Sequence, residues 1–367
     1  MNSTWMNNKE ICDALDITPR SLRRRINKGL VERQVINGSH SYRILDKSLY
    51  PTLTIIDNQI TMPIGPSEKA KKTKAHIEQV RHYIEALASI SAKTSMRVNI
   101  PPPKSHTSLC ILLTDTHVGK KTDFGFNTKT ALKCINSIPN KIFSLPINFD
   151  HVGEIVLLLG GDMIEGEDIY GTQDHHIDSP VIKQVENATQ AIWDLAVNLR
   201  ENLDIPVRIE TCPGNHGRMS KTAHEESNWD NVIYQHLYLV SQERCDENLV
   251  VNPNFRVFNI INIQGHNCLL HHYGTKHTGT AATRIKLAGW MHVKKWDFMC
   301  HGHYHKSEIG SLYGKQIIKN GSLSGYDDLA EQMGEWDPPR QTWFLVTKNT
   351  PIKVIGFLDF DHGKTKE

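Results

Sequence analysis

Beyond residue 107, several short apolar runs each end in His or are followed within three residues by Asp or Asn. The runs span 109–114, 154–160, 207–212, 267–272 and 296–301. Apolar runs of this length are typical of buried strands. Between and around them, helical segments are expected near 180–203, 225–243 and 280–291. Strands alternating with helices indicate an α/β fold, in which ligands bind at the strand ends, so the polar residues there are candidate site residues.

The densest of these polar groups is CHGHYHK at 300–306, which carries His301, His303 and His305. Side chains of extended backbone alternate between faces, so His303 and His305 are expected to project to the same side. Gly302 would let the chain come close to whatever they hold. A single buried histidine is usually a satisfied core residue, but two converging imidazoles indicate a metal ion. We interpret His301 as structural, or as supporting a ligand.

The other strand ends carry similar residues. TDTHVG supplies Asp115 and His117, and GGDMIEG supplies Asp162. CPGNHGR supplies Asn215, His216 and Arg218, and LLHHYG supplies His271 and His272. Each motif alone is weak, because an Asp after a strand is commonly a helix cap. All of them in this order, each at the end of an apolar run, form a strong signal.

The order DxH, GD, GNH, H, GHxH resembles the signature of the calcineurin-like metallophosphoesterase family, across about residues 108–360. KNGSLSG at 319–325 also resembles the family's Asn-x-Gly-Ser stretch. The resemblance implies an α/β (α+β) fold, a sandwich of two mixed sheets flanked by helices. It also implies two metal ions at the strand ends.

Motif position assigns the ligands that the resemblance implies. One metal would be held by Asp115, His117 and His305, the other by Asn215, His271 and His303, and Asp162 would bridge them. His271 is chosen over His272 as the first residue beyond its strand, although a one-residue slip would exchange the two. Mixed nitrogen and oxygen ligands suit Mn, Fe, Zn, Co or Ni better than Ca or Mg, and Mn is the leading expectation, with Fe, Zn, Co or Ni as alternatives.

Such a site suits attack on a phosphoester. Two cations about 4 Å apart lower the pKa of a bridging water and neutralise charge on the phosphoryl oxygens. His216 would protonate the leaving oxygen. Arg218 either clamps a phosphate oxygen or is a surface arginine. Asp174, His175 and His176 are interpreted as a solvated loop.

One residue departs from a subfamily pattern. SbcD-like repair nucleases carry a histidine three residues beyond the bridging aspartate, and Glu165 stands there in this chain. The type of nuclease therefore stays open.

The start of the chain carries a different pattern. Residues 9–28 predict two short helices broken at DITPRS, and 29–45 predict two strands joined across NGS. The pattern resembles winged-helix modules of the MerR and excisionase type. Residues 1–50 hold nine Lys/Arg against five Asp/Glu. DNA contacts are expected from Arg20, Arg23, Arg24 and Arg25 on the second helix and from Arg43 in the hairpin. The alternative is a basic, solvated helix on a small packing domain.

The predicted domains are a winged helix-turn-helix at 1–50, a linker at 51–107 and the metallophosphoesterase domain at 108–367. The linker is expected to be loop-like over 51–66. It then forms an amphipathic helix over 67–93, either packed on its own chain or paired, and ends in the stiff PPPKSHT at 101–107.

Composition limits the classes of partner and the cellular compartment that can be expected. The formal net charge of +2 makes no case for nucleic acid by itself, so local charge must make it. The seven cysteines stand singly, which argues against a disulfide framework and a cysteine-built zinc site and favours the cytoplasm. No run approaches a membrane span, and the first residues lack the blocks of a signal peptide.

Three functions stay open. The leading hypothesis is a metal-dependent phosphodiesterase that cuts DNA, with residues 1–50 as the targeting module. The alternative is a phosphoesterase acting on nucleotides, RNA or a phosphoprotein, whose first domain binds proteins. The third is a DNA-binding regulator with an inert phosphoesterase domain, against which the intact ligand set counts. DNA is the expected partner, a homodimer is an option, and no membrane contact is expected.

Overall fold

The computed structural model describes residues 105–362 apart from 168, 172, 277–279, 328–329, 331–333 and 335. Before these it describes 7–14, 22, 26, 31–36, 39–44, 54–56, 59–61 and 103. The chain divides into two compact units, Met1–Ala86 and Leu87–Glu367. The domain boundaries expected after residues 50 and 107 stay predictions.

The first unit contains one of the expected helices and the expected hairpin. Helix α1 spans Asn8–Ala14. Asn7 and Glu10 cap it by exchanging side-chain hydrogen bonds with each other's backbone N–H, at 2.8 and 2.9 Å. Strands β1 (Val31–Ile36) and β2 (Ser39–Ile44) pair antiparallel with Ile36 opposite Ser39, which confirms the predicted hairpin. The winged-helix assignment stays a prediction.

The expectation of a loop over 51–66 is wrong in part. Strands β3 (Thr54–Ile56) and β4 (Gln59–Thr61) form a second antiparallel hairpin. The β-branched residues of this stretch favour extended backbone, and this preference outweighs the loop-like composition around them. The helix expected at 67–93 lies outside the described residues.

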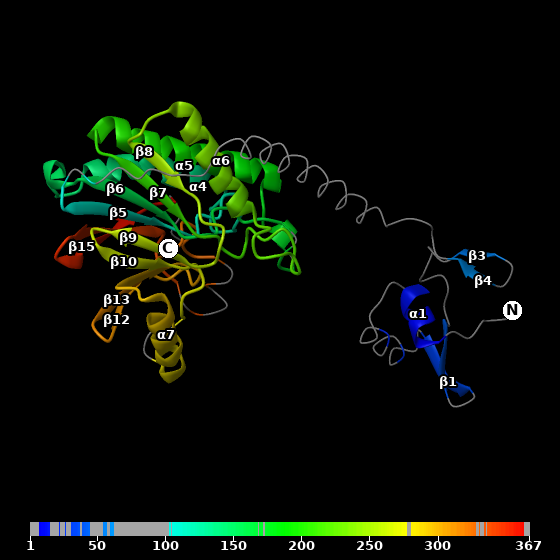
Figure 1. The fold of residues 1–367 in the computed structure, drawn as a ribbon. Coiled ribbons are helices and arrows are strands. Elements are labelled where there is room, and N and C mark those ends of the chain that lie inside the picture. The colour runs from blue at the N-terminus through cyan, green and yellow to red at the C-terminus, as the bar shows by residue number, and fades with distance from the viewer. Residues whose placement is uncertain are drawn as a thin grey trace. The chain divides into compact units, whose positions relative to one another are not determined.

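The second unit is built on two mixed sheets (Figure 1). The six-stranded sheet has the order β15-β14-β5-β6-β7-β8, in which β5 to β8 run parallel. Its strands are β5 (Thr107–Leu113), β6 (Glu154–Leu159), β7 (Val207–Thr211), β8 (Leu249–Asn252), β14 (Arg340–Thr347) and β15 (Thr350–Asp359).

The five-stranded sheet has the order β12-β13-β11-β10-β9, with β10, β11 and β13 parallel. Its strands are β9 (Asn259–Ile263), β10 (His266–Leu270), β11 (Phe298–His301), β12 (Glu308–Leu312) and β13 (Lys315–Lys319).

The two sheets pack face to face across one apolar core. Leu112, Leu158 and Phe344 of the six-stranded sheet belong to the same buried cluster as Leu270 and Phe298 of the five-stranded sheet. Helices flank the sandwich, as Figure 1 shows. The six-stranded sheet is flanked by α4 (Thr128–Phe143), α5 (Val181–Leu203) and α6 (Trp229–Arg244), and the five-stranded sheet by α7 (Ala281–Lys294). The predicted two-sheet sandwich is confirmed.

The predicted strands and the helices α5, α6 and α7 are confirmed, but some elements were missed. Helix α4 contains Pro139, which normally ends a helix, yet Ile135, Ile138 and Ile142 form one buried face. Strands β8, β9 and β12 are short, and only part of each is buried. A short, half-buried strand leaves too few alternating residues to stand out.

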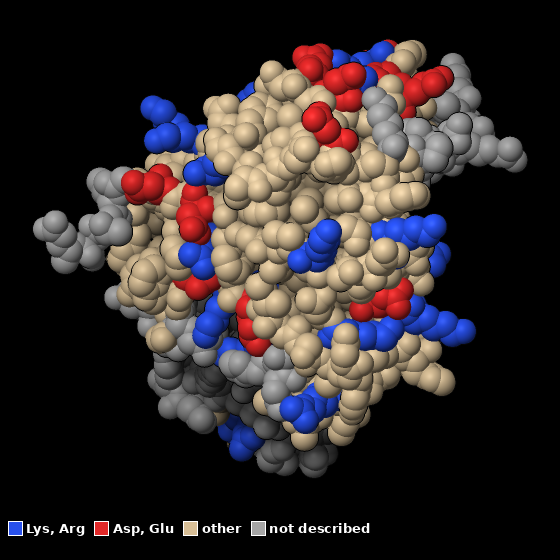
Figure 2. Space-filling model, turned by 90° about the vertical axis from the view of Figure 1, so that its left-hand side faces the viewer, with Lys and Arg blue, Asp and Glu red and all other residues tan. Residues whose placement is uncertain are grey.

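The surface charge and the hydropathy of the helices bear on which partners the chain can bind. Figure 2 shows Lys and Arg interspersed with Asp and Glu on the face drawn, in keeping with the small net charge. In the part of the chain that the structure describes, no helix is long and apolar enough to cross a membrane.

Candidate metal centre

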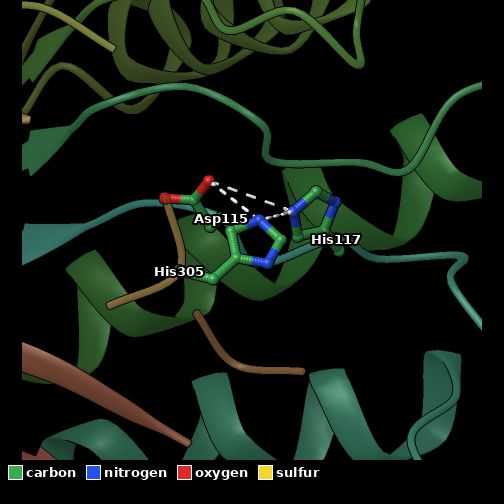
Figure 3. Close-up of side chains that lie close together, drawn as sticks. All are labelled: Asp115, His117 and His305. Carbon is green, nitrogen blue, oxygen red and sulfur yellow. Dashed lines mark hydrogen bonds and ion pairs between the residues drawn. The ribbon is translucent and has the colours of Figure 1, made fainter. Parts of the chain in front are cut away.

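The first group of candidate ligands is Asp115, His117 and His305 (Figure 3). Asp115 and His117 follow β5, and His305 follows β11. Nε2 of His305 lies 3.0 Å from Nε2 of His117 and 3.4 Å from Oδ1 of Asp115. Asp115 and His117 are fully buried. The structure therefore brings together the three residues that the resemblance assigned to one metal.

The orientation of His117 favours a cation. Its Nδ1 lies 2.8 Å from Oε2 of Glu165, and its Nε2 lies 3.9 Å from Oδ1 of Asp115 and 3.0 Å from Nε2 of His305. Burial lowers the pKa of His117 to about 4. A neutral imidazole held in this way is the usual form of a metal-binding histidine.

The second group is Asp162, His272 and His303. Nε2 of His272 lies 3.0 Å from Oδ2 of Asp162 and 3.1 Å from Oδ1 of Asn215. Nδ1–H of His272 donates to the Gly160 carbonyl at 2.8 Å, so the Nε2 lone pair of a neutral His272 faces the oxygens of Asp162 and Asn215. A cation at this point, either a divalent metal or a proton on Nε2, satisfies all three atoms.

A proton is the other cation that this geometry accepts. Burial lowers the pKa of His272, but Asp162 above all outweighs burial and raises that pKa to about 9. Asp162 also lies with His117 and His216 in a third group of possible ligand atoms. Asp162 therefore stands between the two sites, where the resemblance expects a bridging ligand.

The choice of His271 is corrected. Its Nδ1 lies 2.6 Å from the Val257 carbonyl, and its ring stacks on Phe258 with centroids 4.2 Å apart. The backbone N–H of His271 still donates to Cys300, so the strand pairing runs one residue past β10. Side chains alternate along a strand, so His272 turns to the opposite side, toward the ligands.

The expected extended backbone at the GHxH motif is also wrong. His303 and His305 have positive φ values of 75° and 54°, so they occupy a tight loop, and each joins a different group. Three further candidate ligands share this disfavoured conformation: Asp115, His117 and Asp162, with φ of 51°, 44° and 54°. Strained backbone of this kind clusters at functional sites, where the surrounding structure holds it.

Two glycines make room for the carboxylates. A Cβ on Gly302 would lie 2.1 Å from Oδ2 of Asp115, and one on Gly214 would lie 2.1 Å from Oδ1 of Asp162. Any other residue would push the carboxylate away. Gly302 thus lets the chain approach the candidate ligand Asp115, while its expected approach to a group held by His303 and His305 stays a prediction.

His216 lies in the third group, with Asp162 and His117. Its backbone N–H donates to Oδ1 of Asp162 at 2.7 Å, and its ring Nδ1 lies 3.3 Å from Oε1 of Glu165. Burial lowers the pKa of His216, but Glu165 and then Asp162 outweigh it and raise that pKa to about 9. The two carboxylates therefore favour the protonated form of His216, which is the form that a general acid needs.

Two buried carboxyl groups that support the site were missed as site residues. Glu165 was noted only as a departure, yet it contacts both His117 and His216. Asp230, in the first turn of α6, accepts from the backbone N–H of Asp162 at 2.9 Å and of Gly214 at 2.8 Å. Burial, followed by the charge of Asp162, raises the pKa of Asp230 to about 6.

The stretch after β13 supports Asp115. Ser322 Oγ donates to the Asp115 carbonyl at 2.9 Å, and the Asn320 side chain donates to the Leu112 carbonyl and to Thr114 Oγ1. KNGSLSG therefore holds the end of β5. His301 is fully buried and belongs to none of the three groups, in line with a structural role.

The remaining candidates have mixed placements. Arg218 lies beside the site, where its Nε donates to the Asn215 carbonyl at 3.0 Å. Its phosphate contact stays a prediction. Asp174, His175 and His176 are exposed, as the solvated-loop interpretation expects, but Gln173 of the same loop is buried. Arg20, Arg23, Arg24 and Arg25 lie outside the described residues, and Arg43 is described only as part of β2.

Comparison with known proteins gives structural likeness alone. No protein-family model and no curated protein matches the chain. Vps29 from Entamoeba histolytica in complex with Zn²⁺ is 15% identical, with 69% of this chain and 99% of that chain covered and a TM-score of 0.31. An archaeal phosphodiesterase is 11% identical, with 69% of this chain and 99% of that chain covered and a TM-score of 0.35. A conserved protein from Streptococcus pneumoniae, described as a predicted phosphoesterase, is 10% identical, with 69% of this chain and 98% of that chain covered and a TM-score of 0.30. At these values the likeness assigns no activity.

Proposed function

We propose that this chain is a metal-dependent phosphodiesterase that hydrolyses DNA. The observation that carries the proposal is the position of Asp162, which lies in the same group of possible ligand atoms as His272 and His303 and in another with His117 and His216. One buried carboxylate thus joins both candidate metal sites to a candidate proton donor. Phosphodiester hydrolysis needs these parts together.

The metal sites use seven residues. Asp115, His117 and His305 would hold one ion, Asn215, His272 and His303 the other, and Asp162 both. When bound, two divalent ions supply an activated water and neutralise charge on the phosphoryl oxygens. Their nitrogen and oxygen donors suit Mn, Fe, Zn, Co or Ni better than Ca or Mg, and Mn is the metal proposed first.

The chain itself supplies the proton for the leaving group. Nδ1 of His216 faces Glu165, so Nε2 is the atom that donates to the leaving oxygen. Glu165 keeps a negative charge for this task. Burial raises the pKa of Glu165, but His216 and then Lys120 outweigh burial and hold that pKa well below its usual range.

Arg218 is proposed to contact a phosphate oxygen. Its guanidinium is held by the Asn215 carbonyl and by the Tyr170 hydroxyl, next to a candidate ligand. A guanidinium fixed in this way still has donors for a phosphoryl oxygen.

The proposal of DNA as substrate rests on the first unit. The confirmed hairpin of β1 and β2 follows a predicted second helix that carries Arg20, Arg23, Arg24 and Arg25. A basic helix followed by a hairpin suits contacts to phosphates and base edges. The first unit would bring the catalytic unit to its substrate.

The test compares substrates under one condition. The full chain is incubated with Mn²⁺ and, in turn, with labelled linear duplex DNA, circular single-stranded DNA, RNA and bis-nitrophenyl phosphate. We expect hydrolysis of the chromogenic diester and faster hydrolysis of at least one DNA. Hydrolysis of the diester and RNA without DNA would replace DNA by another phosphodiester. No hydrolysis with any divalent metal would overturn the enzyme itself.

A further inference from the structure

One aromatic side chain stands beside the candidate proton donor. Tyr170 lies in the segment between β6 and α5, and its ring centroid is 4.9 Å from that of His216, with the two planes tilted by 42°. The side chain is 41% exposed. A large exposed ring thus stands next to the candidate proton donor.

Tyr170 is held at both ends. Its hydroxyl accepts from Nδ2 of Asn215 at 2.8 Å and from the Arg218 guanidinium at 3.2 Å. Its backbone N–H donates to Oε1 of Gln173 at 3.2 Å, and the buried Gln173 is itself bound to the Glu165 carbonyl at 2.5 Å. An exposed tyrosine usually loses rotamer freedom when it binds a ligand, whereas this one is already fixed.

The position of the Tyr170 hydroxyl is explained by its contact with Asn215. By accepting from Nδ2 of Asn215, it turns Oδ1 of that amide toward His272. That role uses only the hydroxyl and would be served equally by a buried ring. The exposed face of the ring is therefore left without a function in positioning Asn215.

We infer that the ring of Tyr170 is a stacking platform for the base of the nucleotide on the leaving side of the scissile phosphate. The inference rests on the proposed function. His216 protonates the leaving oxygen, so the leaving nucleotide passes His216 and meets the adjacent ring. Aromatic side chains stack on any base, because every base has a π-face. A base stacked on protein is not stacked in a duplex, so the cleaved strand is single or frayed at this point.

The test uses two dinucleotides that differ by one base. The first is a thymidine dinucleotide. The second is the same compound without the base on the sugar whose oxygen leaves phosphorus. For the full chain with Mn²⁺, we expect a KM about tenfold lower for the first, in the range of base stacking on an aromatic side chain. The ratio of the two KM values isolates the contribution of the base.

Two substitutions separate the ring from the hydroxyl. Tyr170→Leu should bring the KM ratio close to one. Tyr170→Phe should keep the ratio, while turnover of both substrates falls because the Asn215 amide loses its acceptor. Tyr313→Leu is the control, because Tyr313 is an exposed tyrosine in the turn between β12 and β13, outside the candidate metal centre, and should keep the ratio.

Each outcome decides between the platform and its alternatives. Equal KM values in the unsubstituted chain, or an unchanged ratio in Tyr170→Leu, would overturn the platform and leave the phosphodiesterase intact. Loss of the ratio in Tyr170→Phe would assign the effect to the hydroxyl and overturn the stacking role. Hydrolysis of the nitrophenyl diester with neither dinucleotide cleaved would remove the nucleic-acid substrate, and the platform with it.

Discussion

Oε2 of Glu165 lies 2.8 Å from Nδ1 of His117. The other oxygen of the same carboxylate lies 3.3 Å from Nδ1 of His216. One buried acid thus orients a candidate metal ligand and charges a candidate proton donor. Carboxylates that hold metal-binding histidines typically change metal affinity or activity about 10- to 100-fold when removed.

Glu165→Gln keeps the shape of this side chain and removes its charge. Glu165 is the main group that raises the pKa of His216, so that pKa should fall. A general acid works while it is protonated, at pH values below its pKa. As the pH is raised, the variant should therefore lose activity earlier than the unsubstituted chain, so the alkaline limb of its kcat profile should shift to lower pH. Glu186→Gln, at an exposed carboxylate on α5, is the control. If the alkaline limb stays at the same pH, Glu165 does not control the pKa of His216.

Alanine substitutions of His271 and His272, one at a time, test which of the two binds metal and which only stabilises the fold. His272→Ala should lose metal and hydrolysis, because Nε2 of His272 faces Asp162 and Asn215. His271→Ala should keep both and lose only stability, since it removes a hydrogen bond to Val257 and a stack on Phe258. Metal content per chain and chromogenic turnover are measured together. The opposite pattern would restore His271 as the ligand.

Asp162→Asn and His303→Ala should each abolish hydrolysis without unfolding the chain. Asp162 serves both proposed ions, and His303 serves one. Circular dichroism and thermal melting check the fold, and elemental analysis checks the metal. Near-native activity with unchanged metal content in either variant would contradict the two-metal assignment.

His216→Asn should lower turnover about 10²- to 10⁴-fold with little loss of metal, since it removes proton donation to the leaving oxygen. The loss should shrink for a nitrophenolate leaving group, which needs no proton. Rates on a nitrophenyl diester and on an alkyl diester give the comparison. Equal losses on both substrates would argue against the role of general acid.

Replacement of Arg23, Arg24 and Arg25 by alanine in the full chain tests the first unit. DNA binding should weaken and its salt dependence should flatten, by roughly one unit of slope for each of these arginines that binds a phosphate. Nitrophenyl diester hydrolysis should persist, because all proposed ligands lie beyond residue 114. Lys183→Ala, at an exposed lysine on α5, serves as the control. Unchanged DNA binding would favour a protein-interaction role for the first unit.

The sequence by itself determined the order of the buried strands and the residues that follow them. Strands such as Leu109–Leu113 and Ile155–Leu159 are continuous apolar runs, because both faces of a sandwiched sheet are covered. Asp115, His117, Asp162, Asn215, His303 and His305 follow such runs directly, so their meeting at the strand ends could be predicted.

Tertiary structure decided which way the side chains at the strand ends turn. Whether His271 or His272 faces the site depends on how far β10 stays paired with its neighbour, a contact between segments about 30 residues apart in the chain. The tight loop at His303, where φ is positive, likewise depends on a distant contact, because the backbone N–H of His303 donates to Oδ1 of Asp115.

Tertiary structure also decided which distant groups support the site. Glu165 meets His216, and Asp230 meets Asp162, only because parallel strands bring their ends to one edge of the sheet. Tyr170 reaches Asn215 for the same reason. Local periodicity carries no information on such pairs, since their contact depends on the packing of whole strands and not on neighbouring residues.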